Sequence, residues 1–266
     1  MILSDALGAL SNLFDAGLSV ALLAFACVVL FGAGLIKGFI GLGLPTVSMA
    51  LLTLLLDARL AVSLILVPML ASNIWQMLRG DDLRLILRRY WRFAVVLAIC
   101  VGVTVWVTRS APDAVLRLVL GIMLLVFAFS SWKRIVPEVS PALIRPVELI
   151  AATFAGVVGG LAAAWAGPMA MYLSARRVAQ NEFVQALGFL ISAGSLPLLL
   201  GYVAVGHAST SELAVSTALL VPTLLGYSIG EAFRRRTSPE LFRKALLVVF
   251  TCLGVNLVIS SLTDFL

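Results

Sequence analysis

The sequence predicts an all-α polytopic membrane protein, built as a single integral domain over residues 1–266. Hydrophobic residues make up 62% of the chain and charged residues only 12%, which is more apolar surface than one soluble core of this length can bury. Apolar runs of roughly 17–25 residues, the length of a helix that spans a bilayer, recur along the chain. These runs are rich in Leu, Ala and Gly and do not alternate polar with apolar residues, which argues against a β-barrel.

Ten apolar segments are predicted along the chain, and eight to ten of them are expected to cross the membrane. They cover approximately residues 18–36, 45–56, 60–78, 92–108, 114–132, 148–164, 168–178, 183–205, 212–231 and 244–262. The second and the seventh are too short to span a bilayer comfortably. Both follow a glycine-rich break, so we expect each to form a half-length helix.

The two breaks have the same pattern. The first runs from Gly34 to Pro45, and the second runs from Gly156 to Pro168. Each is a cluster of glycines in an apolar stretch, closed by a proline that opens a new apolar run. This pattern predicts a broken helix hairpin, in which a helix and a half-length helix are joined by an unwound crossover. Such backbone at membrane depth has to be buried in protein or line a wet cavity.

The two hairpins divide the chain into two repeats of about five segments each. The first covers about residues 17–134 and the second about 148–264, joined by a polar, proline-containing linker at about 135–147. A shift of 123 residues superposes Pro45 on Pro168 (45 + 123 = 168) and Ser72 on Ser195 (72 + 123 = 195). Five crossings per half is an odd number, so the halves are expected to have opposite topology, as in many secondary transporters.

The positions of the basic residues predict the orientation in the membrane. Fifteen of them fall in loops that a single threading places on the cytoplasmic side: Arg79, Arg84, Arg88, Arg89, Arg92, Lys133, Arg134, Arg145, Arg176, Arg177, Arg234, Arg235, Arg236, Arg243 and Lys244. This threading puts both termini in the periplasm of a multi-pass protein of the bacterial inner membrane. The net charge of +6 then reflects topology, and no basic stripe interleaved with aromatics predicts a nucleic-acid partner.

The two prolines predict an anion site. Proline suits the first turn of a helix, so the half-length helices starting at Pro45 and Pro168 would direct free backbone N–H groups and their positive dipole ends at the breaks. Two such ends that converge near the membrane midplane would bind a small anion. The alternative is that the prolines only kink the bundle.

Lys37 is the single basic residue that falls inside an apolar run and not at a loop. Because an ionisable group inside a membrane is costly, such a residue is by default a functional candidate. Lys37 would add positive charge beside the two helix ends. The alternative is that its ammonium group reaches the cytoplasmic interface.

Polar residues of the third and eighth segments complete the candidate site. They either line a substrate path or hydrogen-bond a neighbouring helix, and glycines at four-residue spacing either admit a ligand or serve helix packing. The full set of candidate substrate-binding residues is Lys37, Gly38, Gly41, Gly43, Pro45, Thr46, Ser72, Asn73, Gln76, Gly167, Pro168, Met169, Ser192 and Ser195.

The sequence does not predict an enzyme. It has no G-x-S-x-G, H-E-x-x-H or Walker motif, no metal-ligand cluster and no signature of a cofactor. The thirteen acidic residues fall at loops or segment ends, which argues against an ATP-driven pump. A coupling proton or sodium ion and a homo-oligomer are left open.

The chain resembles the TauE/SafE family of sulfite exporters, also called toluene-sulfonate uptake permeases. The resemblance lies in the break that ends in Pro45, the Asp57–Ala61 turn, the polar patch Ser72–Gln76, and a weaker echo from Gly156 to Ser195. It covers nearly the whole chain and implies a bacterial inner-membrane carrier for sulfite, sulfoacetate or other organosulfonates. The chain departs from the usual pattern at residues 162–165, where Ala-Ala-Ala-Trp stands in place of a denser glycine loop.

The sequence therefore predicts a secondary transporter that moves a small anion, sulfite or organosulfonate-like, by alternating access. Backbone of both breaks would hold the anion, with charge from Lys37 and orientation from Ser72, Asn73 and Ser195. The membrane potential alone would drive export of an anion, by about 2.3 kcal/mol per charge per 100 mV. An anion channel, a carrier of another small organic anion and a non-transporting scaffold subunit are the alternatives.

Overall fold

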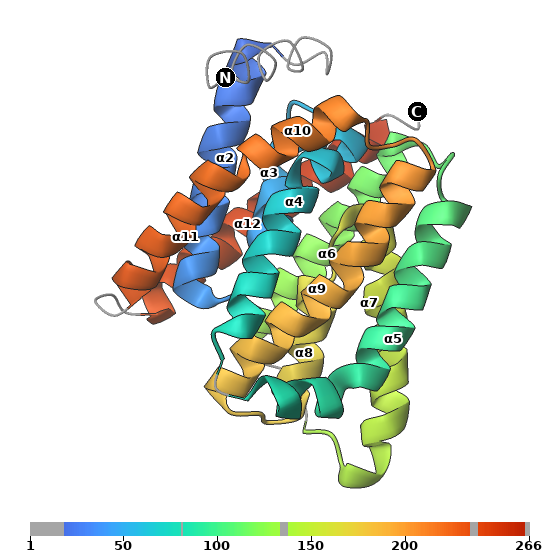
Figure 1. The fold of residues 1–266 in the computed structure, drawn as a ribbon, viewed down its shortest axis with the longest axis vertical. Coiled ribbons are helices and arrows are strands. Elements are labelled where there is room, and N and C mark those ends of the chain that lie inside the picture. Colours follow the sequence, from blue (N-terminus) through green and yellow to red (C-terminus); the bar gives the residue numbers. More distant parts are fainter. Residues whose placement is uncertain (1–18, 81, 134–137, 235–238, 264–266) are drawn as a thin grey trace, which may run out of the picture.

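The computed structural model describes residues 19–80, 82–133, 138–234 and 239–263, and these residues form a bundle of helices without strands (Figure 1). The helices are α2 (Val20–Ile40), α3 (Leu44–Leu52), α4 (Ala58–Leu78), α5 (Leu83–Val107), α6 (Asp113–Lys133), α7 (Ile144–Ala162), α8 (Ala166–Ala175), α9 (Gln180–Ala204), α10 (Thr210–Ala218), α11 (Leu220–Arg234) and α12 (Pro239–Thr263), with a short 3-10 turn η1 (Pro141–Leu143). The predicted all-α class is confirmed.

The lengths of the helices fit a multi-pass membrane protein. In the described part of the chain, seven helical stretches are long and apolar enough to cross a bilayer: α2, α4, α5, α6, α7, α9 and the pair α10–α11. Residues 250–263 of α12 form a shorter apolar stretch. The segment predicted at 212–231 is divided, because α10 ends at Ala218 and α11 begins at Leu220.

The helices of the two halves have matching neighbours. Helix α2 of the first half packs against α11 of the second half. In the same way, α7 of the second half packs against α5 of the first half. Helices α4 and α9 hold equivalent positions in the two halves and are in contact, and the same is true of α6 and α12. The contact of α3 with α12 has its counterpart in the contact of α8 with α6. If the two halves were exchanged, the same pairs of helices would still be neighbours. The inverted topology of the repeats stays a prediction.

Glycines allow the closest helix contacts. A Cβ on Gly34 or Gly38 of α2 would lie 2.2 or 2.1 Å from a carbonyl oxygen of α11, and a Cβ on Gly226 or Gly230 of α11 would lie 2.0 Å from a carbonyl oxygen of α2. In the other half, a Cβ on Gly156 of α7 would lie 2.4 Å from Cβ of Cys100 on α5. The four-residue glycine spacing therefore serves backbone-to-backbone packing of helices in the bilayer.

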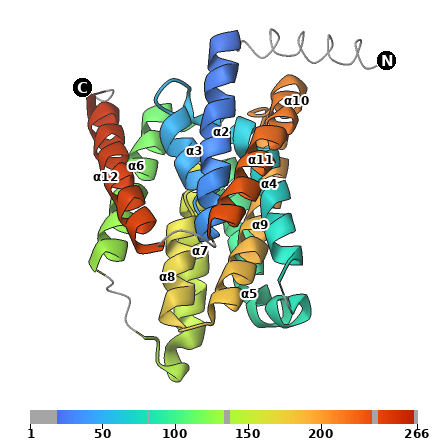
Figure 2. The same cartoon turned by 90° about the vertical axis from the view of Figure 1, so that its left-hand side faces the viewer.

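Both predicted hairpins are present, and each contains residues with a left-handed backbone. In the first, α2 ends at Ile40 and the chain turns through Gly41 (φ 88°) and Gly43 (φ 107°) into α3, a conformation that glycine adopts at little cost. In the second, Ala163 takes the left-handed position (φ 53°) between α7 and α8. Figure 2 shows α3 in the upper half of the molecule and α8 in the lower half.

One end of the bundle carries an arginine-rich face, formed by Arg79, Arg84, Arg88, Arg89 and Arg176. Two ion pairs cross it: Arg79 to Glu231 at 2.9 Å and Arg89 to Glu182 at 2.8 Å. Arg176 lies over the ring of Tyr90, 5.3 Å from its centroid. These contacts join helices of the two halves, while the cytoplasmic location of this face stays a prediction.

Several predicted features lie outside the described residues. Both termini (1–18 and 264–266), the first part of the linker (134–137), and Arg235 and Arg236 belong to these segments.

The glycine packing predicts a sharp positional effect on stability. Gly34→Val should lower the free energy of unfolding by about 1–3 kcal/mol, because the new side chain would overlap the Thr223 carbonyl on α11. Gly32→Val, on the same helix, is the matched control, since nothing lies within 4 Å of the Cβ position there. Melting temperatures in detergent micelles would test this, and equal loss of stability in both variants would contradict it.

Candidate functional site

The two breaks meet at one cavity. Leu42, Gly43 and Thr46 line it from the first hairpin, and Ala164, Ala166 and Gly167 line it from the second. Leu120, Met123, Leu124 and Phe127 of α6 and Phe250 of α12 close the remaining sides. Its volume is about 10 Å³, whereas one water molecule needs roughly 10–15 Å³. The cavity therefore has no room for a polyatomic anion in this conformation.

Two helices begin at this cavity, and neither has a side-chain cap. Gly43 is the N-cap of α3 and Trp165 is the N-cap of α8, and no side-chain hydrogen bond satisfies either first turn. Because the first N–H groups of a helix have no partner within it, both ends present donors and the positive end of a dipole. The structure thus brings together the two helix starts that Pro45 and Pro168 predict.

Lys37 lies one helical turn before the first break and is buried, with 1% of its surface exposed. Its Nζ donates to Oγ of Ser72 at 3.1 Å and to Oδ1 of Asn73 at 2.6 Å, both on α4. The side chain is therefore enclosed between helices and does not extend to the surface of the protein.

The surroundings of Lys37 are polar but carry no counter-charge among its hydrogen-bond partners. Ser72 and Asn73 each pass a hydrogen bond on to the carbonyl oxygen of Met69, at 3.2 and 2.7 Å. A buried ammonium group held only by neutral acceptors keeps its electrostatic field largely uncompensated. Lys37 itself does not line the cavity.

Gln76 holds the first break in place. Its Nε2 donates to the carbonyl oxygen of Gly41 at 3.0 Å and to that of Val184 on α9 at 2.7 Å. Its Oε1 is buried and has no hydrogen-bond partner in the described structure. The side chain satisfies unwound backbone that water cannot reach, as non-helical structure at membrane depth requires.

Other predicted residues lie apart from the cavity. Gly38 contacts the backbone of α11, so helix packing accounts for it. Ser192 and Ser195 donate within α9, to the carbonyl oxygens of Gly188 and Ile191. The structure therefore joins neither serine to the cluster around Lys37.

Pro45 and Met169 are buried in the first turns of α3 and α8, while Pro168 is half-buried and lines a separate groove. Of the predicted set, Gly43, Thr46 and Gly167 line the cavity, and Lys37, Ser72, Asn73, Gly41 and Gln76 form the polar shell beside the first break.

Sequence reasoning missed three aromatic residues at the site. Trp165 is fully buried against Gly159 and Gly194, and its Nε1 has no partner in the described structure. Phe127 and Phe250 both line the cavity, with ring centroids 6.0 Å apart. In an apolar run such residues look like ordinary core, and only Trp165 had a signal in the sequence, because it follows three alanines where a denser glycine loop was expected.

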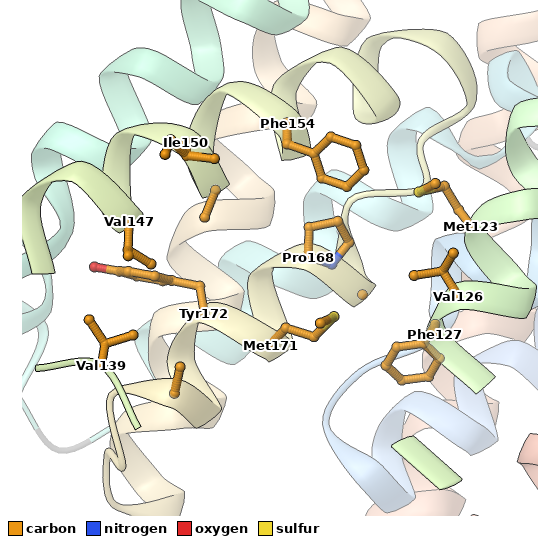
Figure 3. Close-up of a pocket in the computed structure, with 13 residues that line it drawn as sticks. Met123, Val126, Phe127, Val139, Val147, Ile150, Phe154, Pro168, Met171 and Tyr172 are labelled. Atoms are coloured by element: carbon orange, nitrogen blue, oxygen red, sulfur yellow. The ribbon is translucent and has the colours of Figure 1, made fainter. Parts of the chain in front are cut away.

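An open apolar groove runs along α8 from Gly167, which also lines the cavity, to Tyr172 and Ala175, next to Arg176 of the arginine-rich face (Figure 3). Its volume is about 450 Å³ on the same scale as above, and α6, α7 and α8 form its walls. Figure 3 shows Phe127 and Met123 on the α6 side, across from Phe154 and beside Pro168 of α8. Met123, Phe127 and Gly167 line both the groove and the cavity, so they separate the two spaces.

The described residues include no group of three or more His, Cys, Asp or Glu side chains that would hold a metal ion. Among the residues that line the cavity, Thr46 is the one with a hydrogen-bonding side chain, and Gly43 and Ala166 lie at the starts of α3 and α8.

A sequence model of the family described as sulfite exporter TauE/SafE matches residues 25–257, nearly the whole chain. No curated protein matches the chain, and no solved structure does.

The polar cluster predicts a strong energetic coupling between Lys37 and Asn73. Lys37→Met would leave Oδ1 of Asn73 unpaired, and Asn73→Leu would remove the shortest hydrogen bond of a buried ammonium group. Each single change should destabilise the protein, and the double variant should lose less than the sum. We expect a coupling energy of about 0.5–3 kcal/mol from denaturant unfolding of the four proteins. Strict additivity would mean that the two side chains do not interact.

Proposed function

The chain belongs to the sulfite exporter TauE/SafE family, and on that premise we propose that it is a secondary transporter for sulfite or an organosulfonate-like anion. It acts in the bacterial inner membrane by alternating access. The observation that carries the proposal is the convergence of two uncapped half-helices, one from each half, on one cavity.

The donors at the cavity suit the chemistry of this substrate. A sulfite or sulfonate group presents three oxygen atoms with little preference for one direction. Backbone N–H groups of Leu44 and Thr46 on one side, and of Ala166 and Gly167 on the other, would approach them from two sides. Helix dipoles bind an anion without the long side chains of arginines, so the site can close tightly around a small substrate.

Lys37 contributes charge from the second layer of the site. Its ammonium group, held by Ser72 and Asn73, would stabilise a bound anion through space, and the low dielectric of the protein interior strengthens this effect. Gln76 donates a hydrogen bond to the carbonyl oxygen of Gly41, which would reduce the repulsion between this oxygen and the anion.

The small volume of the cavity fits a site whose lining has to move before an anion can pass. A volume for about one water molecule has no room for a sulfite ion. The two hairpins are built into opposite halves of the molecule (Figure 2), which gives each side of the membrane its own moving element. With a potential negative inside, the anion would be driven outward, by about 2.3 kcal/mol per charge per 100 mV.

The direct test is sulfite flux into proteoliposomes that hold the purified protein, with an imposed potential of either sign. We expect saturable flux that follows the potential, counterflow against preloaded sulfite, and competition by sulfonates more than by carboxylates. Linear flux without counterflow would identify a channel instead. No flux with any sulfur oxyanion, from protein that elutes as a folded species, would refute the proposed substrate class.

Lys37→Met should reduce sulfite flux strongly while leaving a folded protein. The loss of one buried positive charge near the site removes a through-space attraction, and we expect anion binding to weaken roughly tenfold, which corresponds to about 1.4 kcal/mol. Arg88→Met, which removes a positive charge from the exposed arginine-rich face, is the control and should retain flux. Normal flux in the Lys37 variant would remove the lysine from the mechanism.

Thr46→Val should raise the KM for sulfite by roughly tenfold, because the variant keeps the shape of the side chain and loses its hydroxyl at the cavity. Thr53→Val makes the same change at the far end of α3, where the hydroxyl donates to the Met49 carbonyl. Concentration dependence of flux separates the two variants, and an unchanged KM for Thr46→Val would place the anion elsewhere.

A further inference from the structure

The cavity between the two breaks is sealed by a pair of phenylalanines, one from each half of the chain. Phe127 of α6 and Phe250 of α12 both line it, and their rings pack at a centroid distance of 6.0 Å and an angle of 59°. The shift of 123 residues that superposes Pro45 on Pro168 also superposes Phe127 on Phe250 (127 + 123 = 250).

Phe127 covers the start of α8. A Cβ built on Gly167 would lie 3.2 Å from Cδ2 and 3.4 Å from Cβ of Phe127, so the ring is packed onto the backbone of the first turn. Ala166 and Gly167 of this first turn line the cavity. The other edge of Phe127 lines the open groove, as Figure 3 shows, so this side chain lies between the groove and the cavity, beside Gly167, which lines both.

Phe250 lies on α12, which contacts the half-length helix α3 of the first hairpin. The pair α12–α3 is in contact just as the pair α6–α8 is, and Phe250 lines the cavity together with Gly43 and Thr46 of the first hairpin. The two rings differ in exposure: Phe250 is 2% exposed, whereas Phe127 is half-buried and borders the groove. In this conformation Phe250 is thus enclosed in the protein, whereas Phe127 borders the open groove.

We propose that Phe127 and Phe250 are the two gates of the transport site, Phe127 toward the arginine-rich face and Phe250 toward the opposite face. This inference rests on the proposed transport function. Rotation of the Phe127 side chain into the groove would join the cavity to the groove and so open it toward the arginine-rich side. Movement of Phe250 would uncover the start of α3 to the other side. Contact between the two rings keeps one closed while the other opens.

The gate is tested by the rate at which a reagent reaches the cavity, a measurement that needs no transport. Ala164, which lines the cavity, is replaced by cysteine in a chain whose Cys27, Cys100 and Cys252 are serine. A small charged methanethiosulfonate reagent that cannot cross membranes is added to whole cells or to inside-out vesicles. Labelling is read as protection from a later polyethylene-glycol maleimide.

Phe127→Ala should raise the labelling rate about tenfold or more from the arginine-rich side only, as expected when a barrier falls by about 1.4 kcal/mol. Phe250→Ala should raise it from the opposite side only. Phe154→Ala is the matched control, since this phenylalanine lines the groove but not the cavity, and its rate should equal that of the parent. Phe127→Trp should slow labelling, which tests the gate even if Phe127→Ala does not fold.

The proposal is overturned if Phe127→Ala labels no faster than Phe154→Ala, or if it labels equally faster from both sides. The result is distinguishable from failure of the proposed function. Side-specific labelling without sulfite flux would leave the gates standing and refute the substrate. Sulfite flux with unchanged labelling in all variants would keep the carrier and refute the gates.

Discussion

The need to satisfy unwound backbone in a low-dielectric interior is the constraint on which this structure depends. Each hairpin interrupts a helix where no water is available, so every exposed N–H and C=O at the break requires a partner or a ligand. On the first break, Gln76 supplies that partner for the Gly41 carbonyl. The starts of α3 and α8 have no side-chain cap, and in the proposed function an anion binds their N–H groups. Stability and binding thus follow from the same broken backbone.

Helix packing positions these breaks. The carbonyls of α2 and the glycines of α11 approach so closely that no side chain fits between them, and α5 and α7 form the corresponding contact. Without a hydrophobic force between helices in lipid, this close packing is what holds the outer helices to the core. It leaves α3 and α8 as short inner elements whose N-terminal ends converge, with Lys37 beside them.

Much of this architecture could be predicted from the sequence, because its signals are local. The clusters that end in Pro45 and Pro168 mark both breaks, and Lys37 is conspicuous in an apolar run. The contacts across the bundle could not be predicted in this way. Ser195 matches Ser72 under the repeat, yet it donates within its own helix. Ala163 takes a left-handed conformation, which is not expected of an alanine. A phenylalanine in an apolar segment gives the same sequence pattern whether it faces lipid or a cavity.

The asymmetry within the pair of phenylalanines connects the repeat to transport. Two equivalent halves with identical surroundings would place the cavity equally close to both sides, and neither side would be favoured. Here Phe250 is enclosed, whereas Phe127 borders a groove of about 450 Å³ that runs along α8 to Ala175, next to Arg176. In the proposed mechanism the halves would exchange these surroundings, and the same packing would give access from the other face at little net energetic cost. The same residue type in unequal surroundings would then let a nearly symmetric helical bundle alternate between two states.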